Sequence, residues 1–267
     1  MSRMICTLLG TGSSGGVPRV GGDWGACDPA ETRNRRMRCS ALIERISPED
    51  RRTTVLVDTS PDLREQLLQA GTRRLDAVVY THDHADQAHG IDDVRPFAIR
   101  QRAPIPVFMN AETRATLASR FRYCFEGAGG YPPILDTQPE LIPYVPFRID
   151  GEGGPIEFLP VTMEHGRIEC LGFRIGDLAY CNDVNGLPER TLDALRGLGT
   201  LVIDALRYAP HPTHANLEQA LAWIETLRPT RAVLTNLHVD MDYQTLCREL
   251  PAGVSPAYDG MVLEFGS

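Results

Sequence analysis

The stretch THDHADQAHGIDDVR, residues 81–95, contains three of the seven histidines in the chain. It overlaps the end of the aliphatic run LDAVVYT, which predicts a buried strand. His82 and His84 alternate with Asp83, so both imidazoles face one side of an extended segment, as two ligands of one cation require. Asp86, two residues further on, adds a carboxylate on that side. The pattern H-x-H-x-D therefore predicts a metal site.

Other candidate ligands also stand where predicted strands end. His165 comes shortly after IEFLPVT, Asp183 ends LAYCND, and His238 lies just past RAVLTN. Loops at the edge of a rigid sheet can bring such residues to one point. We therefore expect one constellation of ligands rather than scattered surface histidines.

Strand-like runs alternate with helical patterns along the chain. Strands are predicted in MICTLLG, TTVLVD, LDAVVYT, IPVFM, IEFLPVT, LAYCND, TLVIDAL and RAVLTN. The clearest helix is ANLEQALAWIETLRP, where Leu217, Ala220, Leu221 and Ile224 form one apolar stripe, and weaker helices are predicted over 59–69 and 111–120. This mixture indicates an α/β or α+β fold. Without repeats, charge blocks or a long linker, we expect a single domain over residues 1–267.

The composition excludes several classes of function. The formal net charge is −8, so no basic excess argues for general nucleic-acid or membrane-surface binding. All 27 basic residues are arginines, which excludes Schiff-base chemistry and a phosphate-loop lysine. The chain has no run of 18 apolar residues and no signal-peptide pattern, and its seven cysteines are scattered, so we expect a soluble cytoplasmic protein with reduced thiols.

Three motifs together resemble a known family. The H-x-H-x-D segment resembles the H-x-H-x-D-H signature of the metallo-β-lactamase-fold hydrolases. GTGSSGGVPRVGG, from Gly10, is similar to the glycine turn of the branch that contains phosphoribosyl cyclic phosphodiesterases and tRNA 3′-processing nucleases. NRRMRCS, from Asn34, also fits the phosphodiesterase branch. The resemblance covers nearly the whole chain and implies an αββα four-layer sandwich of two mixed β-sheets flanked by helices.

The resemblance implies two metal sites that share one aspartate. The first would be held by His82, His84 and His165, with Asp183 bridging. The second would be held by Asp86, Asp183 and His238. Two adjacent cations would activate water near neutral pH and stabilise charge in the transition state, which places Asp86 among the catalytic groups. Imidazoles suit zinc and carboxylates also admit manganese, so the identity of the metal stays open.

The sequence departs from the family pattern at two places. Gln87 stands where the signature has a histidine, and an amide oxygen is a weaker donor to zinc, so the second site should bind less tightly or prefer a harder ion. His89 either substitutes as a ligand or lies behind the site or in solvent. The loop GGDWGAC has only Cys27, and one thiolate cannot hold the structural zinc that some relatives carry there. We expect that zinc to be absent.

Several residues are candidates for catalysis or substrate binding. His214 resembles the histidine that opens the corresponding helix in these relatives, where it would protonate the leaving alkoxide or bind the scissile phosphate; a helix cap is the alternative. His211 is a candidate for substrate contact. Arg38, beside Arg35 and Arg36, suits either a substrate phosphate or an acidic neighbour.

Asp58 ends the predicted strand TTVLVD. It either orients a metal-bound histidine by accepting its second N–H or is a turn residue at the strand end.

The leading interpretation is an enzyme, a metal-dependent phosphodiesterase that acts on a small nucleotide or cyclic phosphate ester. One alternative is a lactone, thioester or β-lactam hydrolase on the same fold, since fold alone does not set the substrate. Another is a nucleotide-binding protein that has lost turnover, because Gln87 is expected to weaken the second metal site. A tRNA nuclease is disfavoured because no long basic insertion could grip tRNA. The sequence leaves open whether the chain forms a homodimer.

Overall fold

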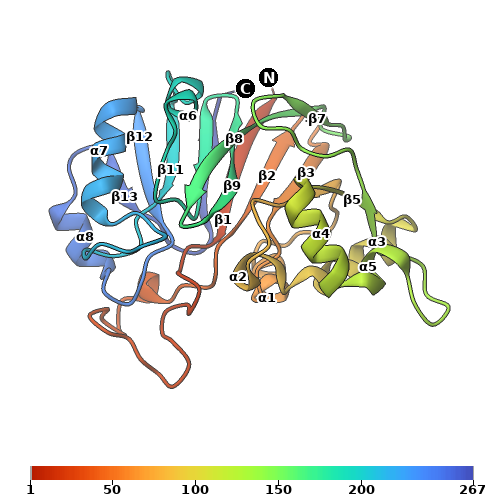
Figure 1. Cartoon of the computed structure of the whole chain (residues 1–267), viewed down its shortest axis with the longest axis horizontal. Coiled ribbons are helices and arrows are strands. Elements are labelled where there is room, and N and C mark those ends of the chain that lie inside the picture. The colour runs from red at the N-terminus through yellow and green to blue at the C-terminus, as the bar shows by residue number, and fades with distance from the viewer. Residues whose placement is uncertain (1, 267) are drawn as a thin grey trace.

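The computed structural model describes residues 2–266 and is built on two seven-stranded β-sheets that pack against each other (Figure 1). The first sheet has the order β14-β1-β2-β3-β4-β5-β6, with bounds Met261–Phe265, Arg3–Gly10, Ser40–Ile46, Arg52–Val57, Ala77–Val79, Ile105–Phe108 and Leu135–Thr137. The second has the order β13-β12-β11-β10-β9-β8-β7, with bounds Val254–Pro256, Arg231–Thr235, Thr200–Asp204, Leu178–Cys181, Ile168–Ile175, Ile156–His165 and Phe147–Ile149. All eight strands predicted from the sequence are present.

Both sheets are mixed. In the first, β14, β1, β2 and β3 pair antiparallel, whereas β3, β4, β5 and β6 run parallel. In the second, β7 to β10 pair antiparallel and β10 to β13 run parallel. The carboxyl ends of parallel strands meet at one edge of a sheet, which is where open α/β sheets bind ligands. The loops after β3, β4, β10, β11 and β12 carry the site described below.

Helices cover the outer face of each sheet (Figure 1). The first sheet packs against α1 Leu63–Gln69, α2 Ala85–Ala88, α3 Arg95–Gln101, α4 Ala111–Arg120 and α5 Arg122–Glu126, and short 3₁₀ turns lie at Thr32–Asn34 and Ile91–Val94. The second packs against α6 Glu189–Ala194, α7 Leu217–Leu227 and α8 Tyr243–Glu249. The expected αββα sandwich is confirmed. No helix within residues 2–266 is long and apolar enough to cross a membrane.

The central core lies between the two sheets. Alternate side chains of each strand point inward, and the large ones include Phe158 of β8 and Phe173 of β9, both fully buried. The ring of Phe158 stacks on that of Phe147, with centroids 5.4 Å apart, and meets the edge of Phe173 at 6.0 Å. Phe108 of β5, in the first sheet, stacks on Phe147 with centroids 5.1 Å apart, and aliphatic side chains from both sheets fill the rest of this close-packed core.

The turn after β1 requires glycine because its backbone lies very close to that of residues 36–38. A Cβ at Gly10 would lie 2.0 Å from the carbonyl oxygen of Arg38, and one at Gly12 would lie 2.8 Å from Cβ of Arg36. Only glycine fits at such distances. The turn is thereby held against residues 36–38 at the same edge as the parallel strand ends.

Replacing Phe158 with alanine should remove about 3–5 kcal/mol from the free energy of unfolding, because it leaves a cavity between the sheets. The matched control is Leu68→Ala, whose side chain is exposed and should change stability by less than about 0.5 kcal/mol. Urea denaturation followed by circular dichroism measures both. Equal stability of the two variants would contradict the position of Phe158 in the core.

Candidate metal centre

Three histidines and one aspartate converge at the edge where the two sheets meet. His82 and His84 follow β4, His165 is the last residue of β8, and Asp183 lies two residues beyond β10. One potential ligand atom from each of these four side chains lies within 4.8 Å of all the others. These are the four residues that the family resemblance assigns to the first metal site. The structure thus brings together, from three separate strand ends, a set able to hold one cation.

The ring nitrogens of these histidines are oriented for metal binding. His165 donates from Nδ1 to the carbonyl oxygen of Thr213 at 2.7 Å, which leaves the lone pair of Nε2 free. That Nε2 lies 3.3 Å from Nδ1 of His84. Nε2 of His82 is buried 3.3 Å from Oδ2 of Asp183, yet no described residue makes a well-formed hydrogen bond with it. A divalent cation would satisfy these unpaired nitrogens, so the donors present fit the metal.

Burial and neighbouring charges together set the protonation states of the candidate ligands. Burial lowers the pKa of His165 to about 4, so the ring is neutral, as a metal ligand must be. Burial alone would raise the pKa of Asp183, but the contact with His82 at 3.3 Å and the positive charge of that ring outweigh it and hold the pKa below its usual value. Burial also lowers the pKa of His84, so the centre combines neutral imidazoles at His84 and His165 with an ionised carboxylate beside His82.

Asp58 supports His82 through an intervening threonine. Its Oδ1 and Oδ2 accept hydrogen bonds of 2.8 Å from the backbone N–H and the hydroxyl of Thr81. The hydroxyl oxygen of Thr81 lies 3.0 Å from Nδ1 of His82 and can accept its N–H. Burial raises the pKa of Asp58 to about 7, although the contacts with His82 and Thr81 lower it. The sequence raised direct orientation of a histidine by Asp58, and the structure shows that the contact runs through Thr81.

Three of the polar residues at these strand ends have left-handed backbone conformations. The φ angles are 61° for Asp58 after β3, 55° for Asp183 after β10 and 61° for Asn236 after β12. Asp and Asn adopt this region more readily than other residues with side chains. At these positions the chain turns sharply as the strand ends.

Two buried amides contact the carboxylates of the centre. Gln87, in α2, donates from Nε2 to Oδ2 of Asp183 at 2.9 Å and to Oδ2 of Asp86 at 3.2 Å. Asn236 donates from Nδ2 to Oδ1 of Asp183 at 2.9 Å. Sequence reasoning missed Asn236 as a site residue, although it closes the predicted strand RAVLTN. A polar side chain at the end of a predicted buried strand was the feature of the sequence that could have identified it as a site residue.

The structure places two histidines away from the cluster. His238 lies beside the guanidinium of Arg19, and its Nδ1 lies 3.3 Å from Oδ2 of Asp240. Within residues 2–266, the ligand atoms of Asp183, Asp204 and His214 form a second converging group, and His238 belongs to neither group, so its role as a ligand stays a prediction. His89 is exposed at the end of α2, and its ring packs against Phe121 with centroids 5.6 Å apart.

A histidine–aspartate pair lies next to the candidate metal ligands. Nδ1 of His214 lies 2.8 Å from Oδ2 of Asp204, the buried last residue of β11, and the ring of His214 is 4.7 Å from that of His165. Burial alone would lower the pKa of His214, but the hydrogen bond and charge of Asp204 raise it well above its usual value. The N-cap of α7 is Asn216, which accepts from the backbone N–H of Gln219 at 3.0 Å. His214 therefore does not cap the helix.

His214 opens into a small pocket beside the glycine turn. The cavity has a volume of about 260 Å³ and is lined by Ser13, Ser14, Gly15, Arg19, Leu206, Arg207, His211, His214 and His238. The rings of His211 and His214 are 5.2 Å apart. Arg19 and Arg207 add permanent positive charge to its wall. The pocket suits a small anionic group close to the metal ligands.

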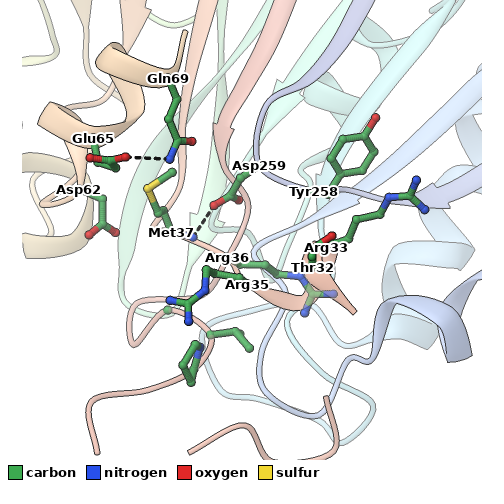
Figure 2. A pocket seen from close by; sticks show the side chains of 13 residues that line it. Thr32, Arg33, Arg35, Arg36, Met37, Asp62, Glu65, Gln69, Tyr258 and Asp259 are labelled. Carbon is green, nitrogen blue, oxygen red and sulfur yellow. Dashed lines mark hydrogen bonds between the residues drawn. The ribbon is translucent and has the colours of Figure 1, made fainter. Parts of the chain in front are cut away.

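The arginines of the NRRMRCS segment lie outside this pocket. Arg38 is bound to Asp62, with Nη2 2.9 Å from Oδ1 and Nε 2.6 Å from Oδ2, which matches the alternative of an acidic neighbour. Arg35 and Arg36 line a different and larger cavity of about 780 Å³, which Tyr258 also lines (Figure 2). The two cavities share no lining residue. The structure thus does not bring Arg38 to the metal centre, and its role in binding substrate stays a prediction.

Replacing Thr81 with valine should lower zinc affinity about 10–100-fold, because His82 loses the hydroxyl that orients its ring. Thr81→Ser keeps that hydroxyl and serves as the control, with affinity close to that of the unchanged protein. Competition with a chromophoric chelator measures both constants. Wild-type affinity in the valine variant would show that the hydroxyl does not position His82.

Comparisons with known proteins agree with this geometry. Residues 53–236 match the model of the beta-lactamase superfamily domain. A crystal structure described as a new diphosphatase from the PhnP family is 35% identical, with a TM-score of 0.88 over 99% of this chain and 98% of that one. Zn²⁺-bound PqqB from Methylobacterium extorquens is 17% identical, with a TM-score of 0.74 over 97% and 99% of the two chains, which shows the shared fold alone.

A curated relative is larger than this chain. An octanoyltransferase of Porphyromonas gingivalis is 33% identical over 262 residues, which are 97% of this chain and 51% of that protein. The chain therefore spans about half the length of that relative. The family model, the similarity to the diphosphatase along its whole length and the cluster of histidines and aspartate lead to one assignment. The chain belongs to the beta-lactamase superfamily and, within it, to the PhnP family.

Proposed function

We propose that the protein is a metal-dependent phosphodiesterase that cleaves a small nucleotide or cyclic phosphate ester. The observation that carries the proposal is the His214–Asp204 pair, which lies beside the metal ligands in a small pocket lined by arginines. A neutral carbonyl substrate does not require fixed positive charge in the pocket, and the thiolate of a thioester leaves without a general acid. The similarity to a PhnP-family diphosphatase at 35% identity supports phosphate chemistry as well.

The metal would be held by His82, His84, His165 and Asp183. When bound, a divalent cation supplies Lewis-acid activation of water and stabilises negative charge on the phosphate. Three imidazoles with one carboxylate favour zinc, and manganese is the alternative that the carboxylate admits. Asp58 and Thr81 hold the ring of His82 in position for this role.

His214 would act as the general acid. Asp204 occupies Nδ1 of the imidazole and favours its protonated form, so Nε2 is the nitrogen that can give a proton to the leaving oxygen. His211 lies next to His214 in the same pocket and would contact the substrate. Arg19 and Arg207 would bind the phosphate oxygens that do not react.

The size of the pocket supports a small substrate. A cavity of about 260 Å³ holds a phosphate group and part of a sugar, and its wall has no extended basic surface for a polymer. Acyl chemistry is the second candidate, because a relative at 33% identity is named octanoyltransferase. Hydrolysis of bis-p-nitrophenyl phosphate, a cyclic nucleotide, a nucleoside diphosphate and an acyl thioester, each with zinc or manganese, separates the two. Turnover of the thioester alone would overturn the phosphodiesterase proposal.

Two substitutions should divide metal binding from proton transfer. His84→Ala removes a ligand, so bound metal and activity should be lost together. His214→Ala removes only the acid, so metal should remain while turnover falls about 10²-fold or more. Elemental analysis beside the hydrolysis assay measures both effects. Equal loss of metal in the two variants would refute this division of roles.

A further inference from the structure

Both carboxylate oxygens of Asp183 accept hydrogen bonds from side-chain amides of this chain. Gln87 Nε2 lies 2.9 Å from Oδ2, and Asn236 Nδ2 lies 2.9 Å from Oδ1. All three side chains are fully buried. An ionised carboxylate can only accept hydrogen bonds, so each amide must present its NH₂ group to Asp183 and not its oxygen. The amide orientations are therefore set by the charge of Asp183.

The same amide of Gln87 also joins Asp183 to Asp86. Its Nε2 lies 3.2 Å from Oδ2 of Asp86, so one NH₂ group contacts two carboxylates. Two carboxylates at one site repel each other, and a hydrogen-bond donor between them reduces that repulsion. The partial positive charge of the amide hydrogens fills that position.

This arrangement does not fit a second metal ion at Asp183. Ligand atoms of Asp183, Asp204 and His214 also converge, but Nδ1 of His214 is paired with Oδ2 of Asp204 at 2.8 Å and Oδ1 of Asp183 accepts from Asn236. The family resemblance places such an ion among Asp86, Asp183 and His238. Each carboxylate oxygen of Asp183 has two lone-pair positions, and Gln87 and Asn236 each occupy only one, so Oδ2 can still bind the ion beside His82. The position between Asp183 and Asp86 is different, because Nε2 of Gln87 contacts Oδ2 of both carboxylates where a second cation would have to lie. His238 lies beside the guanidinium of Arg19, whose charge repels a cation.

We infer that this protein holds a single divalent ion, bound by His82, His84, His165 and Asp183, and that the amides of Gln87 and Asn236 replace a second ion. Permanent positive charge towards the substrate then comes from Arg19 and Arg207, which line the pocket beside the centre. This inference rests on the metal centre of the proposed function but not on its substrate. The number of bound ions tests this inference, whichever substrate the protein hydrolyses.

The first test counts metal ions in the unchanged protein. The protein is stripped of metal with a chelator and dialysed against zinc or manganese, and its metal content is then measured by elemental analysis. One equivalent of either metal is the expected result. Electron paramagnetic resonance of the manganese form shows whether two ions are adjacent, because their spins couple. A coupled pair of manganese ions, or two tightly bound equivalents of zinc, would overturn the inference.

The second test introduces ligands in place of the amides. Combining Gln87→His with Asn236→His should raise the bound metal from one equivalent to two and produce the coupled manganese signal. The control is Gln69→His, which adds a histidine at an exposed position and should leave one equivalent. A double variant that folds and still binds one ion would show that the amides are not what excludes the second.

A conservative variant covers the case in which the double variant does not fold, as judged by circular dichroism. Gln87→Glu keeps the size of the side chain and exchanges its N–H donor for a carboxylate, so a second manganese ion should bind. One equivalent in this variant would contradict the inference. Absence of any metal from the unchanged protein would overturn the proposed function and this inference together. One equivalent without phosphodiester hydrolysis would overturn only the choice of substrate.

Discussion

The buried carboxylate of Asp183 is the group on which the site depends. A buried charge is tolerated only when it is paired and hydrogen-bonded. Its partners here are His82, from the loop after β4 in the first sheet, Gln87 of α2, and Asn236, after β12 in the second sheet. Because these partners come from both sheets, satisfying one charge ties the sheets together at the edge where the candidate metal ligands lie.

Sheet topology explains why this edge carries the chemistry. The parallel strands β3, β4, β10, β11 and β12 all end there, and Asp58, Thr81, Asp183, Asp204 and Asn236 stand at or just beyond their ends. Strand positions are set by the packed cores, so these side chains have little freedom to move apart. The left-handed backbone of Asp58, Asp183 and Asn236 is the strained conformation typical of functional sites.

The glycine turn divides the surface near the site into two cavities of different character. The smaller one lies beside the metal ligands and contains His211, His214 and two arginines. The larger one is lined by Arg33, Arg35 and Arg36 together with Tyr258 (Figure 2). Arg38, which the sequence places in the same basic segment, is neutralised by Asp62. Closeness in sequence therefore did not mean a shared binding surface for these arginines.

The amino-acid sequence alone predicted the fold and the four residues whose candidate ligand atoms converge in the structure. Its eight apolar runs became strands and the stripe at 217–224 became α7, because buried segments have a strong hydrophobic period. Strands Ser40–Ile46 and Ile168–Ile175 were not predicted, since charged residues interrupt their apolar pattern, and pairing with neighbouring strands and burial in the core stabilise them in the structure. Only the tertiary structure decided that Asn236, and not His238, points at Asp183, that Asp204 pairs with His214 and that Gln87 joins two carboxylates. These contacts join residues that are as many as 96 positions apart in the sequence, as for Gln87 and Asp183, or as few as one, as for Gln87 and Asp86. Sequence periodicity contains no information on which side chains meet when separate strand ends converge.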